Sequence, residues 1–264
     1  PHRLTLDLYR VNNRYAPGSL LPALRLPQLR LLGSVQNSEH PAIFVLPVVS
    51  WNNYDKTMPG LLLYNHTLPE QRFEFALAPM YGIGTGRLTG LGDVHANFYP
   101  TEGELIYRLR AGLSARRFTY RTVNRFEQDL GFTRLQPYVE ADFATPHDKR
   151  LRRQLRLEAV WLEEERQSFE DPANPGLTTE AFFLQRAELE LANERAVSPF
   201  SWLFALEHAA FDNFTGAQRY VKATVEWQAV FHYGEDQAAY LRLFGGYFLY
   251  NSEREANYIG RAAF

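Results

Sequence analysis

The dominant pattern in this sequence is a regular alternation of apolar and polar side chains over long stretches. Near residue 108, for example, Leu105, Tyr107 and Leu109 alternate with Arg108 and Arg110. A period of two places successive side chains on opposite faces of an extended strand. The pattern therefore predicts β-strands that each have one apolar and one polar face.

Eleven such stretches follow one another from residue 42 onward. We expect strands at residues 42–50, 54–66, 72–84, 87–99, 104–120, 132–144, 150–167, 181–195, 199–213, 217–233 and 238–251. The alternation weakens only in WLFALEHAAF and YLRLFGGYFLY, where both faces carry apolar groups. Connections such as HTLPEQ, GTG and TPHDKR are short and rich in turn formers, as antiparallel hairpins require. The predicted fold class is all-β, with an up-and-down antiparallel order.

Residues 1–41 have a different texture. LTLDLYR alternates like a strand, but the prolines of YAPGSLLPALRLPQLRLLG disfavour pairing inside a sheet. We therefore predict a linker over residues 1–41 with one candidate strand, followed by a β-domain over residues 42–264. The chain opens on Pro1 rather than Met and is interpreted as a fragment. Two alternatives are open at its C-terminal end: Phe264 is the aromatic last residue that is typical of an outer-membrane barrel, or the domain is truncated there.

Strand length favours a membrane barrel over a soluble one. Most predicted strands are longer than the usual strand length of about five or six residues. They are also long enough to cross a bilayer, which takes roughly 9–11 residues in a tilted strand. Aromatic residues near strand ends, such as Tyr99, Tyr120 and Tyr250, are typical of interfacial girdles. Bacterial single-chain barrels have an even number of strands, so a twelfth is expected from LTLDLYR or from sequence after residue 264. The sequence predicts a transmembrane β-barrel of about twelve strands, in a bacterial outer membrane with outer-membrane lipid as its partner.

In such a barrel the apolar face contacts lipid and the polar face lines the interior. The predicted lipid-facing residues are Phe73, Phe75, Leu77, Leu105, Leu109, Val221, Val225, Trp227 and Phe231. The predicted interior charge network consists of Arg108, Arg110, Arg152, Arg156, Glu158, Arg186, Glu188, Glu190 and Glu226. Its arginines alone would attract anions, but the acidic residues on corresponding faces favour an interior filled by paired charges.

Composition and motifs argue against several function classes. The formal net charge is −2, so no global field favours a nucleic-acid partner. The sequence has no cysteine, no His-Glu-x-x-His motif and no Gly-x-Ser-x-Gly motif. Asp93 and His95 share the polar face without a third ligand at a readable spacing, so we interpret them as hydrogen-bonding groups. GIGTGRLTG is interpreted as a hairpin turn. We predict no catalytic residue, no metal ligand and no cofactor in this segment.

Residues 50–100 carry three distinctive motifs. They are Asn-Asn-Tyr-Asp at residues 52–55, Gly-Leu-x-Leu-Tyr-Asn at 60–65 and Phe-Glu-Phe-x-x-Ala-Pro-Met-Tyr-Gly at 73–82. The segment resembles the C-terminal region of large M1-family metallopeptidases, the aminopeptidase-like gluzincins, of Bacteroidetes-type bacteria. In that family a zinc peptidase domain precedes a region that looks like an outer-membrane β-barrel. The zinc ligands and the catalytic Glu lie in the upstream domain, so none corresponds to a position in this sequence.

The resemblance implies that this chain anchors a covalently attached zinc peptidase domain in the outer membrane. The parent protein would then be a zinc aminopeptidase, and zinc would be bound only upstream. A second hypothesis is an outer-membrane channel for peptides or small solutes. A third is a soluble β-barrel that binds an apolar ligand.

Overall fold

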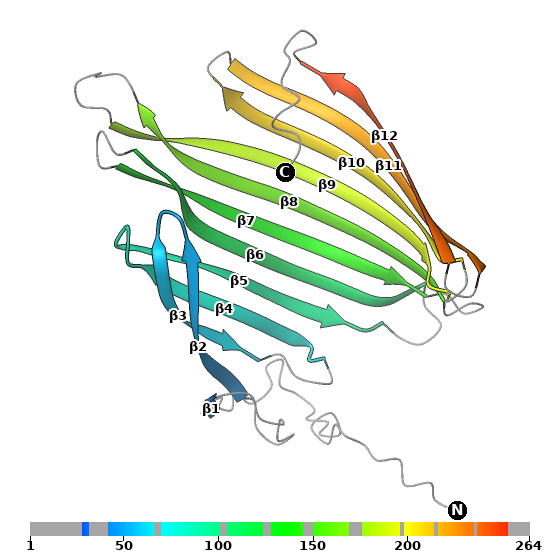
Figure 1. The fold of residues 1–264 in the computed structure, drawn as a ribbon, viewed down its shortest axis with the longest axis horizontal. Helices are drawn as coiled ribbons and strands as arrows, with labels where there is room; N and C mark the ends of the chain where they lie inside the picture. The colour runs from blue at the N-terminus through cyan, green and yellow to red at the C-terminus, as the bar shows by residue number, and fades with distance from the viewer. Residues whose placement is uncertain are drawn as a thin grey trace, which may run out of the picture. The chain divides into compact units, whose positions relative to one another are not determined.

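The computed structural model describes residues 28–31, 42–65, 70–100, 105–123, 128–144, 150–168, 176–195, 198–213, 216–234 and 237–252. These residues form twelve strands (Figure 1). In this part of the chain, no helix has the length and apolar character needed to cross a membrane. The chain divides into two compact units, residues 1–94 and 95–264.

The first unit contains β1 (Gln28–Leu31), β2 (Ala42–Asn52), β3 (Lys56–Tyr64), β4 (Phe73–Gly82) and most of β5 (Arg87–Phe98). β1 pairs with β2 in parallel, whereas the β2–β3 and β3–β4 pairs are antiparallel. The Asn-Asn-Tyr-Asp motif forms the turn between β2 and β3. Its Asn52 side chain accepts hydrogen bonds from the backbone N–H groups of Tyr54 and Asp55, at 2.8 and 2.6 Å. Asp55 is fully buried and accepts a 2.6 Å hydrogen bond from the Thr85 hydroxyl, which ties this turn to the β4–β5 turn.

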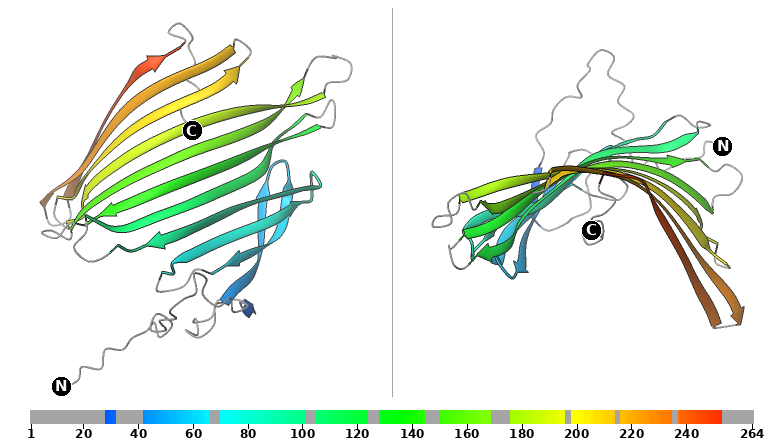
Figure 2. Two further views of the ribbon diagram at one scale, coloured as in Figure 1. Left: turned by 180° about the vertical axis from the view of Figure 1, so that it is seen from behind. Right: turned by 90° about the horizontal axis from the view of Figure 1, so that it is seen from above.

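The second unit contains the end of β5 and seven long strands. They are β6 (Ile106–Val123), β7 (Gln128–Phe143), β8 (Leu151–Ser168), β9 (Gly176–Asn193), β10 (Phe200–Asn213), β11 (Gly216–Gly234) and β12 (Gln237–Asn251). Each pairs antiparallel with the next. Figure 2 shows these seven strands side by side as one twisted sheet.

The twelve strands are hydrogen-bonded in sequence order, with β1 and β12 at the two edges, so the sheet is open. All eleven strands predicted from residue 42 onward are present, the largest end shift being five residues at the start of β9. β1 was not predicted, because four residues next to Pro27 are too few to show alternation. LTLDLYR lies outside the described residues, as does most of the predicted linker. The all-β, mostly antiparallel fold is confirmed; closure into a barrel stays a prediction.

In β4 and β7, acidic side chains are buried while large apolar side chains are exposed, which is the opposite of a water-soluble sheet. In β4, Phe73, Leu77 and Tyr81 are exposed, whereas Glu74 and Met80 are buried. In β7 the two acids Glu140 and Asp142 are only 7 % and 3 % exposed, and the neighbouring Val139 is exposed. Exposed large apolar groups with buried charges are an informative departure from the usual pattern.

Candidate functional site

The polar face of β6, β7 and β8 carries a compact ion-pair cluster. Glu140 on β7 lies 3.7 Å from Arg108, 3.9 Å from Arg110 and 3.5 Å from Arg156. Asp142 makes a 2.6 Å ion pair with Arg108. Two buried acids therefore share three guanidinium groups from the strands on either side.

The register of the strands explains why these side chains meet. Arg110 lies opposite Glu140, which in turn lies opposite Arg156 on β8. Arg108 lies opposite Asp142 in the same way. Directly opposed residues have their Cβ atoms about 5 Å apart, close enough for opposite charges to pair. Antiparallel pairing thus places opposite charges side by side on one face.

Amide groups complete the hydrogen bonding of this cluster. The Gln154 amide donates to Asp142 at 3.0 Å, and the Gln136 amide donates to Glu158 at 2.9 Å. The Arg110 Nε donates to the buried Asn97 side chain at 3.0 Å. Buried charges are tolerated when they are both paired and hydrogen-bonded, as these are.

Next to the cluster, Gly112 makes room for an aromatic ring. A Cβ at Gly112 would lie 2.6 Å from the Tyr138 ring and 2.8 Å from His95. The Arg156 guanidinium lies over the ring of Tyr138, 4.9 Å from the ring centroid. A side chain larger than hydrogen at residue 112 would displace the ring and with it the cation–π contact.

Further ion pairs continue along the same face to β12. They are Arg152–Glu190 at 3.6 Å, Arg186–Glu188 at 2.6 Å, Lys222–Glu207 at 3.1 Å and Arg242–Glu226 at 2.8 Å. Glu207 also accepts a 2.8 Å hydrogen bond from the Tyr220 hydroxyl. Each pair joins neighbouring strands or two residues of one strand.

The structure brings all nine predicted network charges into ion pairs. Arg108, Arg110, Arg152, Arg156, Arg186, Glu158, Glu188, Glu190 and Glu226 each have an oppositely charged partner. The predicted network omitted Glu140, Asp142, Glu207, Lys222 and Arg242, although alternation puts them on the polar face. Knowing the strand register would have revealed them. That this face lines a barrel interior stays a prediction.

The opposite face of the sheet is apolar. Of the predicted lipid-facing residues, Phe73, Leu77, Leu105, Val225 and Phe231 are exposed, and Phe75, Leu109, Val221 and Trp227 are half-buried. Aromatic rings cluster here, with Trp202 and Trp227 centroids 5.8 Å apart and Trp227 and Phe231 centroids 6.5 Å apart. Contact of this face with lipid stays a prediction.

The structure also describes GIGTGRLTG, which spans residues 82–90. GIGTGRLTG contains the β4–β5 turn, closed by a 2.8 Å hydrogen bond from the Gly86 N–H to the Gly82 carbonyl, so the predicted hairpin turn is confirmed. Gly86 has a φ of +68°, which glycine adopts without strain. Among the described residues, no three His, Asp or Glu side chains gather closely enough to hold a metal ion.

The chain matches no protein-family model, and no curated protein and no solved structure matches it.

Proposed function

We propose that this chain is a membrane-embedded β-barrel domain of a bacterial outer membrane, with its apolar face against lipid and its ion-pair face turned inward. The observation that carries the proposal is the inverted burial: Phe73, Val139 and Phe231 are exposed, whereas Glu140 and Asp142 are buried. In a bilayer an exposed apolar face is the stable arrangement.

Strand length supports the same proposal. The seven strands of the second unit have 14 to 19 residues each, which exceeds the span of about 9–11 residues that a tilted strand needs. Unpaired backbone groups at sheet edges are not tolerated in lipid, so in the membrane the edges β1 and β12 require pairing partners. The proposal therefore includes closure of the sheet into a barrel.

The proposed role of the barrel is to anchor a covalently attached zinc peptidase domain, as the resemblance at residues 50–100 implies. The charge cluster on β6–β8 fits a structural role, because its acids are saturated by arginine and amide groups. Peptide hydrolysis by the purified chain that a chelator abolishes would contradict this assignment.

A second candidate function is a channel for peptides or small solutes. It is favoured by the direction of the ion pairs, since each pair on the charged face lies along the sheet, between neighbouring strands or within one strand. Such pairs need no partner from the opposite wall of a barrel. Single-channel recording in planar bilayers separates the two functions: an anchor with a filled interior gives no conductance, and a channel gives discrete steps.

The membrane assignment is tested by refolding the chain with and without detergent or lipid vesicles. We expect β-sheet circular dichroism and heat-modifiable gel migration only in the presence of detergent or lipid. Folding to a monodisperse species in plain buffer would overturn the proposal and would favour a soluble barrel whose apolar face encloses a ligand.

A further inference from the structure

Two arginines on the charged face of the second unit lie directly opposite each other. Arg116 on β6 pairs in register with Arg134 on β7, and alternation puts both on the face of Arg110 and Glu140. In the ion-pair cluster described above, the same register sets arginines opposite acids. Like charges at directly opposed positions repel each other and destabilise a sheet. The Arg116–Arg134 pair therefore needs a physical explanation.

Neither of these guanidinium groups has a hydrogen bond or an ion pair with another described residue. Arg116 is exposed, and Arg134 is half-buried. The Arg134 Nε is buried and has no hydrogen-bond acceptor in the part of the chain that the structure describes. A buried donor without an acceptor is costly, and it indicates an acceptor that these residues do not supply.

The acids near this pair are held by other groups. Glu164 on β8 is diagonal to Arg134 in register. Its carboxylate lies 3.3 Å from Arg166, which also makes a 2.8 Å ion pair with Glu180. On β5, the strand next to β6, Asp93 has an interaction of its own. The donors of the two opposed guanidinium groups are therefore available to a ligand.

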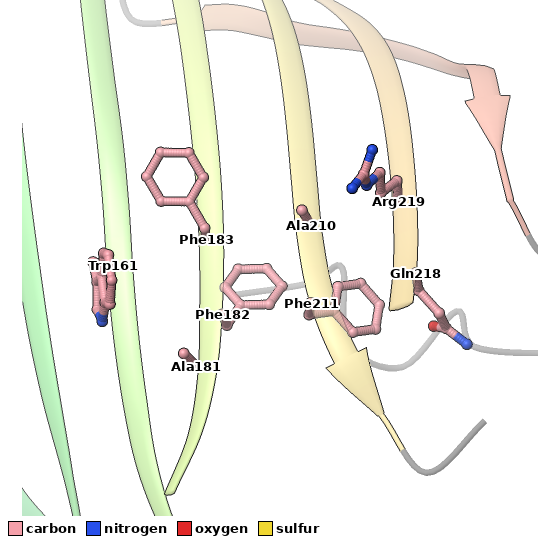
Figure 3. Close-up of a pocket in the computed structure, with 8 residues that line it drawn as sticks. All are labelled: Trp161, Ala181, Phe182, Phe183, Ala210, Phe211, Gln218 and Arg219. Atoms are coloured by element: carbon pink, nitrogen blue, oxygen red, sulfur yellow. The ribbon is translucent and has the colours of Figure 1, made fainter. Parts of the chain in front are cut away.

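Apolar side chains continue the same row across the next three strands. Leu162 on β8 lies opposite Arg134. Phe182 on β9 lies opposite Leu162, and Phe211 on β10 lies opposite Phe182. The centroids of the two phenylalanine rings are 5.5 Å apart, and Figure 3 shows the rings next to each other. All three apolar side chains are half-buried, so part of each stays accessible. An apolar strip thus adjoins the two guanidinium groups.

This arrangement fits an anion that has an apolar part. The planar fork of an arginine donates two parallel hydrogen bonds to the two oxygens of a carboxylate. Because Glu164 offsets part of the positive charge, a singly charged carboxylate fits better than a doubly charged phosphate. Covering the apolar strip would add to the affinity in proportion to the apolar area buried.

We propose that Arg116 and Arg134 bind the carboxylate of an organic acid whose apolar part lies over Leu162 and Phe182. The proposal rests on the proposed function in one respect, because the charged face must meet water in the interior of a barrel. It adds a class of ligand, carboxylates with an apolar part, which neither anchoring nor unselective conduction requires.

The test is binding of phenylbutyrate to the chain refolded in nonionic detergent, measured by isothermal titration calorimetry. Phenylbutyramide has the same ring and linker without the charge and is the control ligand. We expect phenylbutyramide to bind about tenfold more weakly or not at all, because it cannot make charge-assisted hydrogen bonds. Equal binding of the two compounds would overturn the carboxylate site.

Substitutions locate the binding on the two arginines. Arg116→Gln and Arg134→Gln should each weaken phenylbutyrate binding by about tenfold, the cost of one charge-assisted contact. Arg152→Gln is the matched control, because Arg152 is exposed on the same face and pairs with Glu190 at 3.6 Å. We expect its affinity to equal that of the unaltered chain. A loss in Arg152→Gln as large as in the other two variants would mean general attraction of anions and no specific site.

Stability without ligand distinguishes a binding role from a structural one. Arg116→Gln removes the repulsion between the two guanidinium groups, so the urea midpoint of the unliganded chain should rise or stay unchanged. A lower midpoint would assign Arg116 to the stability of the fold and contradict the proposal. Because Arg116 is exposed, the substitution leaves no cavity in the sheet.

Two further outcomes also count against the site. Displacement of phenylbutyrate by an equal concentration of inorganic phosphate would assign the two arginines to a free anion, with no contribution from the apolar strip. Heat-modifiable migration of the refolded chain is measured first. Its absence would contradict both the membrane barrel and the carboxylate site, whereas a chain that shows it and does not bind phenylbutyrate would contradict the carboxylate site alone.

Discussion

The buried faces of the two units are built from different chemistry, although both units expose apolar side chains on the other face. In the first unit the buried side chains include Phe44, Met58 and Met80, with the Thr89 hydroxyl 3.4 Å from the Met58 sulfur. In the second unit the corresponding burial involves Glu140 and Asp142 in ion pairs. The first unit thus buries large apolar side chains together with the carboxylates of Asp55 and Glu74, whereas the second unit has its buried acids Glu140 and Asp142 in an arginine cluster.

The comparison shows that both units have an apolar exposed face, whereas the chemistry of their buried faces differs. Phe73 and Leu77 of the first unit and Leu157 and Phe231 of the second are all exposed, as expected if one apolar solvent surrounds both units. If these faces line the interior of a barrel, they meet only protein or trapped water, and any well-packed or fully paired set of side chains serves there. Substitutions on the exposed face should therefore lower the free energy of unfolding by similar amounts in both units, whereas substitutions on the buried faces should differ between the units.

The largest effect is expected for a charge placed on the exposed face. Val225 lies opposite Phe204 and Gly245, in the middle of β11. Val225→Arg should lower the free energy of unfolding from lipid vesicles by about 2–4 kcal/mol, because the guanidinium must enter the hydrocarbon. Unfolding in urea, followed by tryptophan fluorescence, gives this value.

The control for this substitution is its sequence neighbour. Thr224→Arg adds the same group to the charged face, where water and acidic side chains are available, and should be clearly milder. Equal losses in the two variants would mean that the two faces of β11 are assigned wrongly.

A cavity in the buried face of the first unit should rank second. Met58 is only 1 % exposed, and Met58→Ala removes a thioether that the surrounding strands close over. We expect a loss of about 2–3 kcal/mol, near the lower end for such truncations. Leu61→Ala, at a half-exposed position of the same strand, is the control and should lose less, because lipid chains fill the space. A larger loss at Leu61 would contradict the burial pattern of β3.

Alternation alone predicted most of this fold, because a period of two over more than ten residues leaves little choice of structure. It placed eleven strands and the two faces of β6, β8 and β11. It weakened in WLFALEHAAF, where Ala205 and Ala209 occupy buried positions on the same face as Glu207. Alanine is small enough for a buried position and is also apolar, so at these residues the two faces of the strand cannot be told apart from polarity alone.

The sequence alone predicted only part of the charge cluster. Its arginines and several acids could be assigned to a face, but Glu140 became its centre only through the register that sets it between Arg110 and Arg156.

Removing the central charge of the cluster should rank third. Glu140→Gln leaves the guanidinium groups of Arg108, Arg110 and Arg156 near one another without their shared acid. Those groups are partly exposed, with 19 %, 21 % and 33 % of their side-chain surface accessible, so water screens part of the loss. We expect about 1–3 kcal/mol by urea unfolding, the range for losing a charged hydrogen-bond partner. Restoring stability with the double variant Glu140→Gln, Arg110→Gln would support mutual repulsion as the cause.

The smallest effect is expected at the edge strand β12. Arg242 pairs with Glu226 through two 2.8 Å hydrogen bonds, yet 67 % of its side chain is exposed. Exposed ion pairs contribute little, because water solvates both partners almost as well as they solvate each other. Arg242→Gln should leave the urea midpoint in vesicles unchanged within error. A loss as large as that of Glu140→Gln would mean that the guanidinium is shielded in the membrane, which requires a further strand or segment to cover β12 on the charged face. Comparing the losses of Arg242→Gln and Glu140→Gln therefore tests whether the charged face of β12 is covered in the membrane.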